Sequence, residues 1–236
     1  MKILGIDSAL ERSSVALVEY GRILGEVEAA LPREQLTWLI PAAKELLEKL
    51  GLSFRDLNAV AVTSGPGSFT GLRLGLATAR TIAQVISIPI ASFKTLDAIA
   101  CNAGEAAPFI CPLIDARKGE IFCALYSASG KSPGKKTDDL ALKPEELLEK
   151  LVSWSGSGRL ALMGNALNRY GELLRNGAPS GTVFLGEETW YPKAGTLALM
   201  GEKLILSGGG LSAMELQADY LRRPEAVVTW EKKYEA

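Results

Sequence analysis

The same arrangement opens both halves of this sequence: an apolar strand that ends in aspartate, followed after a short turn by a second strand. The first copy ends at Asp7 and the second at Asp115. Helical segments follow the strands in each half, with apolar residues at a period of about 3.6. The sequence therefore predicts an α/β chain with two lobes, each a mixed sheet with helices, and each led by antiparallel strands.

Periodicity and turn residues divide the chain into predicted elements. The predicted strands span residues 2–7, 13–19, 22–30, 57–63, 88–93, 109–115, 120–127 and 160–163. The predicted helices span residues 33–50, 69–86, 96–101, 144–152, 167–175 and 194–206. A hairpin turn is predicted at Gly21 and Arg22, and a polar loop at 129–139. Segment 102–108 is the predicted junction, so the lobes are expected at 1–101 and 102–193, with the C-terminal segment 194–236 packing back on the first.

Charge and hydrophobicity exclude several classes of protein. Lysine and arginine total 26 against 27 for aspartate and glutamate, a formal net charge of −1, which argues against broad electrostatic capture of nucleic acid. Arg222, Arg223 and the segment 131–136 are interpreted as local basic patches or as solvated surface. No apolar run approaches the roughly 20 residues of a membrane span, and the chain opens on a strand pattern rather than a signal peptide. We therefore expect a cytoplasmic protein that does not bind membranes.

Histidine and cysteine usage restricts the chemistry further. The chain contains no histidine, which excludes a Ser-His-Asp triad, a Cys-His pair and an H-E-x-x-H metallopeptidase. The three cysteines, Cys101, Cys111 and Cys123, lack the spacing of a zinc site, and their odd number argues against a disulfide framework. Cys111 and Cys123 lie in apolar runs and are predicted to be buried, reduced thiols. We predict neither a catalytic residue nor a metal site.

The helix predicted at 33–50 carries a large aromatic residue away from its core stripe. The predicted stripe consists of Leu36, Leu39, Ile40, Ala43, Leu46, Leu47 and Leu50. Trp38 lies on the opposite side among charged residues. Its position is typical of an interface residue, and equally of an aromatic ring covered by a neighbouring loop.

The helix predicted at 69–86 is apolar on two sides. Gly71, Gly75 and Ala79 recur every four residues, a ridge of small residues that would let another helix approach closely. A further, moderately apolar face contains Leu74, Thr81 and Val85. One face is expected to cover the parent sheet, and the other to meet either a neighbouring helix or a partner subunit.

The chain also contains candidate nucleotide-binding groups. Asp7, Ser8 and Asp115 lie where two strands end, and carboxylates at such positions can hold Mg²⁺ beside nucleotide phosphates. The turn at 8–12 nevertheless lacks glycine, and Glu11 would repel a phosphate, so capping or turn roles are the alternative.

Two glycine-rich segments have competing interpretations. The loop 64–71 (SGPGSFTG) is interpreted as an anion-binding turn or as a tight turn feeding a helix, and it is not a Walker A loop. Segment 207–210 (SGGG) is interpreted as an adenosine-binding turn or as a helix stop.

Four segments, in order along nearly the whole chain, resemble the TsaB (YeaZ) family. They are residues 6–8 and 14–17 with 32–34, residues 65–73 (GPGSFTGLR), residues 115–122 (DARKGEIF) and residues 220–226 (YLRRPEA). The resemblance implies an actin-like (ASKHA) two-lobed fold. It also implies a non-catalytic paralogue of TsaD, the subunit that transfers a threonylcarbamoyl group to the adenosine beside the anticodon of certain tRNAs. TsaD holds its metal through histidines on its first long helix, where this chain has Gln35.

The resemblance further implies partners and their contact surface. TsaD is expected to form a heterodimer with this chain, TsaE to join the assembled complex, and a homodimer to form when the chain is alone. Contact with tRNA is expected only through the complex. The resemblance implies no intrinsic cofactor, and ATP with Mg²⁺ is compatible with the assembled complex. The expected partner-facing residues are Trp38, Pro41, Ala42, Glu45, Gly71, Leu74, Gly75, Thr78, Thr81 and Val85. The rival interpretation is a small-molecule kinase or ATPase of the same fold that uses Asp7 and Asp115.

Overall fold

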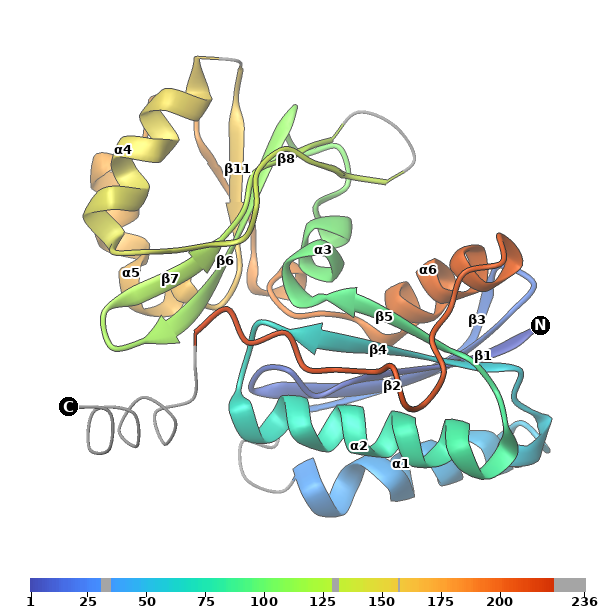
Figure 1. Ribbon diagram of the computed structural model, residues 1–236. Coiled ribbons are helices and arrows are strands. Elements are labelled where there is room, and N and C mark those ends of the chain that lie inside the picture. Colours follow the sequence, from blue (N-terminus) through green and yellow to red (C-terminus); the bar gives the residue numbers. More distant parts are fainter. Residues whose placement is uncertain (31–34, 129–131, 157, 223–236) are drawn as a thin grey trace, which may run out of the picture.

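Two lobes, each built on one mixed sheet, make up the computed structural model, which describes residues 1–30, 35–128, 132–156 and 158–222 (Figure 1). Arg223, Lys131 and the start of the helix predicted at 33–50 lie outside the described residues.

The first lobe contains a five-stranded sheet in the order β3-β2-β1-β4-β5. Its strands are β1 (Lys2–Asp7), β2 (Arg12–Glu19), β3 (Arg22–Ala30), β4 (Ala59–Gly65) and β5 (Ile90–Lys94). β1, β2 and β3 are antiparallel, whereas β1, β4 and β5 run parallel. The carboxyl ends of the parallel strands, at Asp7, Gly65 and Lys94, therefore share one edge of the sheet. Ligands commonly bind beyond this edge in α/β sheets.

Helices cover both faces of this sheet. α1 (Gln35–Lys49) and α2 (Phe69–Ile86) lie on one face, and α6 (Ala194–Leu206) lies on the other (Figure 1). The alternation of side chains along β4 accounts for the two layers. Val60 and Val62 belong to the core beneath α1 and α2, whereas Ala59 and Ala61 belong to the core beneath α6. The small side chains on the second face let α6 lie close to the strands.

The second lobe is built around β6 (Phe109–Arg117), in a sheet of the order β10-β7-β6-β11-β12. Its other strands are β7 (Glu120–Cys123), β8 (Tyr126–Ser127), β9 (Gly134–Lys135), β10 (Leu140–Leu142), β11 (Leu160–Met163) and β12 (Val183–Phe184). The helices are α4 (Pro144–Ser155) and α5 (Ala166–Gly177), with α3 (Thr95–Ala100) connecting the lobes (Figure 1). Short 3-10 helices are η1 (Phe54–Asp56), η2 (Cys101–Ala103) and η3 (Glu187–Thr189).

After α6 the chain returns along the first lobe and crosses to the second (Figure 1). We call residues 211–222 the strap. Leu211 pairs with Ile90 at the edge of the first sheet, and Leu216 is fully buried in the core of that lobe. Tyr220 and Leu221 pack against the core of the second lobe. The strap is thus a further connection between the lobes, besides α3.

Most predicted elements are confirmed, and five match to the residue: the strands at 2–7, 22–30 and 160–163, and the helices at 69–86 and 194–206. A single strand at 120–127 is wrong, because the chain divides into β7 and β8. The predicted loop at 129–139 contains β9, and β10 and β12 were not predicted. These strands have two or three residues, too few to show a period, and form because a neighbouring strand supplies backbone partners.

Smaller predictions are also settled by the structure. The first hairpin turn lies at Tyr20 and Gly21, one residue before its predicted position, and both residues have positive φ. α6 ends at Leu206, so segment 207–210 is a helix stop. Cys111 and Cys123 are buried free thiols, as predicted. Within the described residues, no helix combines the length and hydrophobicity that crossing a membrane requires.

Candidate functional site

The small residues of α2 face the chain's own sheet. Gly71, Gly75 and Thr78 are buried, and the Ser8 hydroxyl donates a 2.8 Å hydrogen bond to the Gly71 carbonyl. A Cβ atom on Gly75 would lie 2.7 Å from Ser8 Oγ, so glycine is needed for α2 to reach the turn after β1. The ridge therefore receives this turn rather than another helix. These three residues, expected on the partner-facing surface, lie inside the chain's own fold.

One flank of α1 faces the edge strand of the sheet. Trp38, Ala42 and Leu46 share this flank, because helix positions four apart lie above one another. Leu46 Cδ1 lies 2.7 Å from where a Cβ atom on Gly25 of β3 would sit. Trp38 is partly buried against the core rather than free among charged residues, and the neighbouring Glu45 is exposed.

The other flank of α1, together with α2, carries exposed apolar side chains. Val85 is 75% exposed, and Leu74 is partly buried at the margin of the core. The prediction that Ile40 belongs to the core stripe is wrong, since its side chain is 50% exposed on the flank away from β3. Pro41 and Thr81 are exposed on the same two helices. We call Ile40, Pro41, Leu74, Thr81 and Val85 the α1/α2 face.

Asp7 is a buried carboxyl group at the end of β1. Its Oδ1 accepts hydrogen bonds from Thr63 Oγ1 at 2.6 Å and from Ala9 N at 3.3 Å, whereas Oδ2 has no hydrogen-bond partner among the described residues. Burial raises the pKa of Asp7 to about 7, and the hydrogen bonds from Thr63 and Ala9 oppose this only in part. Asp7 is thus buried inside the first lobe, with one carboxylate oxygen bonded to Thr63.

Asp115 stabilises a turn, which was one of the roles that the sequence suggested for it. Its Oδ1 accepts a 2.8 Å hydrogen bond from the backbone N–H of Arg117. Arg117 and Lys118, which form the turn between β6 and β7, have φ values of 62° and 53°. The carboxylate therefore stabilises a strained hairpin turn.

Glu11 fills the space between the turns that follow Asp7 and Asp115. Its Oε1 lies 3.0 Å from Arg117 Nη2, and its Oε2 accepts a 2.7 Å hydrogen bond from Asn165 Nδ2. A phosphate entering here would meet the Glu11 carboxylate, which would repel it. No cluster of three or more potential metal-ligating His, Cys, Asp or Glu side chains occurs in the described part of the chain. Sequence reasoning missed Asn165, which lies 154 residues from Glu11 and outside any motif.

The glycine loop before α2 is bonded to the chain itself. Ser68 N donates a 2.7 Å hydrogen bond to Ala9 O, and Ser68 Oγ accepts one of 3.3 Å from Gly71 N as the N-cap of α2. Gly65 has a φ of 128°, and a Cβ atom there would lie 2.2 Å from Asp219 O of the strap. The loop therefore forms the tight turn that leads into α2.

Comparison with known proteins agrees with this arrangement. Residues 23–189 match the family of TsaD, tRNA N6-adenosine threonylcarbamoyltransferase. The chain is 32% identical over 236 residues to the tRNA threonylcarbamoyladenosine biosynthesis protein TsaB of Escherichia coli (strain K12), and the match covers 98% of both chains. YeaZ from Pseudomonas aeruginosa is similar in structure, with a TM-score of 0.80 and 25% identity over 93% of this chain and 99% of that chain.

A more distant likeness concerns the fold alone. A ROK hexokinase from Thermus thermophilus has a TM-score of 0.50 and 15% identity, over 88% of this chain and 100% of that chain. The expected actin-like, two-lobed α/β fold is therefore confirmed. Because the match to TsaB extends over nearly the full length of both proteins, this chain belongs to the TsaB (YeaZ) family.

Proposed function

We propose that this chain is a non-catalytic subunit in the synthesis of threonylcarbamoyladenosine in tRNA. In this role it binds TsaD and activates it for transfer of the threonylcarbamoyl group to the adenosine adjacent to the anticodon. The full-length match to a protein named for this pathway supports the assignment. The match of residues 23–189 to TsaD supports a partner built on the same fold.

The α1/α2 face is the observation that carries the proposal. Val85 and Ile40 remain exposed although both are apolar, and Leu74 is only partly covered by the chain's own core. A subunit surface of this composition is stabilised when a partner removes it from water. A partner of the same fold presents an equivalent pair of helices, so the two pairs would pack side by side. A second copy of this chain would occupy the same face when TsaD is absent.

The region between the lobes supports a non-catalytic role. Asp7 is buried, Asp115 stabilises a turn, and Glu11 occupies the position that a phosphate would need. None of these groups is placed to form the new bond, and the chain has no histidine to act as a base. We therefore propose that it has no cofactor of its own, and that ATP and Mg²⁺ act in the assembled complex, which TsaE joins. Contact with tRNA is proposed to occur through the complex.

Replacing Val85 with glutamate is expected to weaken binding to the TsaD of the same organism by roughly 30-fold or more, because a charge would be buried in an apolar contact. The fold should be unaffected, since Val85 is 75% exposed. Two variants serve as matched controls. Val152→Glu changes an exposed valine on the second lobe, and Glu45→Lys changes the β3 flank of α1. Both should bind TsaD as the wild type does.

The measurement is size-exclusion chromatography with light scattering, followed by titration of the dissociation constant and by an assay of threonylcarbamoyladenosine formation. A species containing both chains, with modification activity only when both are present, would support the proposal. Loss of binding in Glu45→Lys, with binding by Val85→Glu unchanged, would place the contact on the β3 flank instead. If the wild-type chains do not associate, the proposal is wrong, and ATP turnover by the isolated chain becomes the next experiment.

A further inference from the structure

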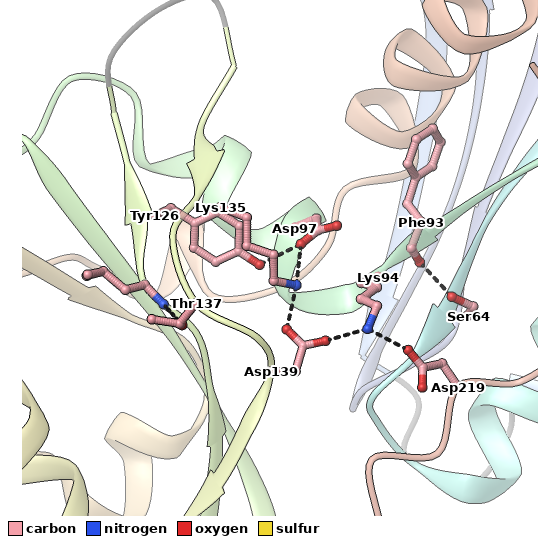
Figure 2. Close-up of polar contacts among 10 residues, drawn as sticks. Ser64, Phe93, Lys94, Asp97, Tyr126, Lys135, Thr137, Asp139 and Asp219 are labelled. Atoms are coloured by element: carbon pink, nitrogen blue, oxygen red, sulfur yellow. Dashed lines mark hydrogen bonds and ion pairs between the residues drawn. The ribbon is translucent and has the colours of Figure 1, made fainter.

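Charged and polar side chains join the lobes on the β5 side of the carboxyl edge of the first sheet (Figure 2). Lys94, the last residue of β5, extends its Nζ to within 3.0 Å of Asp139 Oδ2 in the second lobe. On the connecting helix α3, Asp97 Oδ1 accepts hydrogen bonds from Tyr126 at 2.5 Å and from Lys135 at 3.0 Å. Lys135 also lies 2.5 Å from Asp139 Oδ1. We call these five residues the β5 clasp.

Asp139 is the most deeply buried charge of the β5 clasp, whereas the Lys94 side chain is 44% exposed and the Lys135 side chain 28%. The Asp139 side chain is only 2% exposed, and both of its oxygens face lysine ammonium groups. Attraction between opposite charges rises as water is removed from around them, and removal of one partner would leave a buried, unpaired charge. The hydrogen bond with Asp219 and the ion pair with Asp139 raise the pKa of Lys94, which therefore stays charged.

A second link lies on the β1 side of the same edge. Glu11, in the turn after β1, bonds to Asn165 and Arg117 of the second lobe, as described above. The next residue, Arg12, lies 2.5 Å from Glu187, and its guanidinium stacks 4.7 Å from the ring centre of Tyr191. The β5 clasp and the Glu11 link therefore connect the lobes on opposite sides of the space between them.

The strap adds a third link. Asp219 N donates a 2.8 Å hydrogen bond to Ser64 O at the end of β4, and the Asp219 carboxylate lies 2.9 Å from Lys94 Nζ. Three residues later, Arg222 lies 2.9 Å from Glu120 Oε2 and donates a 2.6 Å hydrogen bond to Ala116 O, both in the β6–β7 hairpin. The strap is thus fastened to both lobes by charged and backbone contacts.

The charges of the β5 clasp are directed at one another rather than at a ligand. They line a pocket of about 680 Å³ together with Ser64, Ser92 and Leu211. A small molecule that bound Lys94 or Lys135 would have to break their existing ion pairs. Every lysine and aspartate of the clasp is already paired, so none could form a new ion pair without losing an old one. The clasp is therefore better suited to holding two lobes together than to binding a substrate.

We propose that the β5 clasp, the Glu11 link and the strap lock the two lobes in a single closed arrangement without any bound nucleotide. Two-lobed enzymes commonly open and close by hinge motion around their ligands. In this chain the contacts that such closure would create are already made by its own side chains. The lobes are thus preorganised as one rigid body, which lowers the ordering cost of binding a partner. This inference does not depend on the partner being TsaD.

The lock can be tested by measuring the distance between nitroxide labels on the two lobes by pulsed electron paramagnetic resonance. Labels would be attached at Gln84→Cys on α2 and Val152→Cys on α4, both exposed positions, in a Cys101→Ala background. Cys111 and Cys123 are buried and would not react. The expected result is one narrow distance distribution that does not change when Mg-ATP is added. A broad or two-peaked distribution, or a shift with Mg-ATP, would overturn the proposal.

A variant pair tests whether the named contacts cause the lock. Lys94→Met combined with Glu11→Gln removes one charge from each side and is expected to produce a second population at longer distance. Lys44→Met combined with Glu48→Gln makes the same chemical changes in an exposed pair within α1, and the single peak should remain. A single peak in both variants would show that these contacts do not hold the lobes. If the first variant does not fold, the wild-type measurement with and without Mg-ATP still decides the question.

Discussion

The wild-type protein is expected to lose stability as the pH rises from 4 to 7, and replacing Asp7 with asparagine is expected to remove this loss. The pKa of Asp7 is raised by burial from 3.8 to about 7, so the folded state keeps a proton that the unfolded chain releases. The contribution of Asp7 to the free energy of unfolding is fully present below pH 3.8 and is lost as the pH rises to about 7. Above that pH the contribution no longer changes. The free energy involved is on the order of 4 kcal/mol. Asparagine resembles the protonated acid and can still accept hydrogen bonds from Thr63 and Ala9.

The measurement is urea unfolding of the wild type and of Asp7→Asn at several pH values between 4 and 8. The stability of the variant relative to the wild type should increase across this interval and then level off. Asp138→Asn, at an exposed aspartate, provides the control, and its curve should run parallel to that of the wild type. A constant difference between Asp7→Asn and the wild type at every pH would mean that Asp7 is ionised in the folded protein.

Replacing Gly65 with alanine is expected to lower the free energy of unfolding by about 3 kcal/mol or more. Two effects add at this position. A φ of 128° is unfavourable for any residue with a Cβ atom, and that atom would lie 2.2 Å from the backbone oxygen of Asp219. Because the obstructing atom is backbone, the strap itself must move. We therefore expect the Asp219 amide, which donates to Ser64 O, to exchange its hydrogen faster in the variant.

Gly156→Ala is the matched control for this substitution. Gly156 has a φ of −56° at the end of α4, and a Cβ atom there would lie 3.6 Å from its nearest neighbour, Ser153 O. Its stability should stay within about 0.5 kcal/mol of the wild type. Equal stability of Gly65→Ala and Gly156→Ala, with unchanged exchange at Asp219, would show that the strap does not rest on the glycine loop.

The two predictions concern neighbouring parts of one arrangement. Asp7 and Gly65 end adjacent parallel strands, and both lie at the sheet edge beside which an enzyme of this fold would bind its ligand. In this chain the edge is occupied by protein groups: Glu11 beyond β1, the strap beyond β4 and Lys94 beyond β5. These groups form contacts between the two lobes at this edge.

Local patterns were sufficient to predict most of the secondary structure. The helix at 69–86 has a clear apolar period, a serine N-cap and a preceding glycine loop, and its bounds are confirmed. The absence of histidine is likewise a property of composition and needs no structure. Strands such as β9 and β12 escaped prediction because two residues show no period and their partners lie elsewhere in the chain.

The sequence by itself therefore determined the order of the longer helices and strands, the two-lobed α/β class and, through its motifs, the family. Only the tertiary structure decided which side of each helix is free. Gly71, Gly75 and Thr78 share a side of α2, and the spacing of small and apolar residues along the helix predicts that this side is packed. The spacing does not tell whether this side packs on the chain's own sheet or on another subunit. The contact between Glu11 and Asn165 joins residues 154 positions apart. Hydrophobic period is a local property that neighbouring residues encode, whereas such contacts depend on how distant elements pack, and no local pattern encodes that.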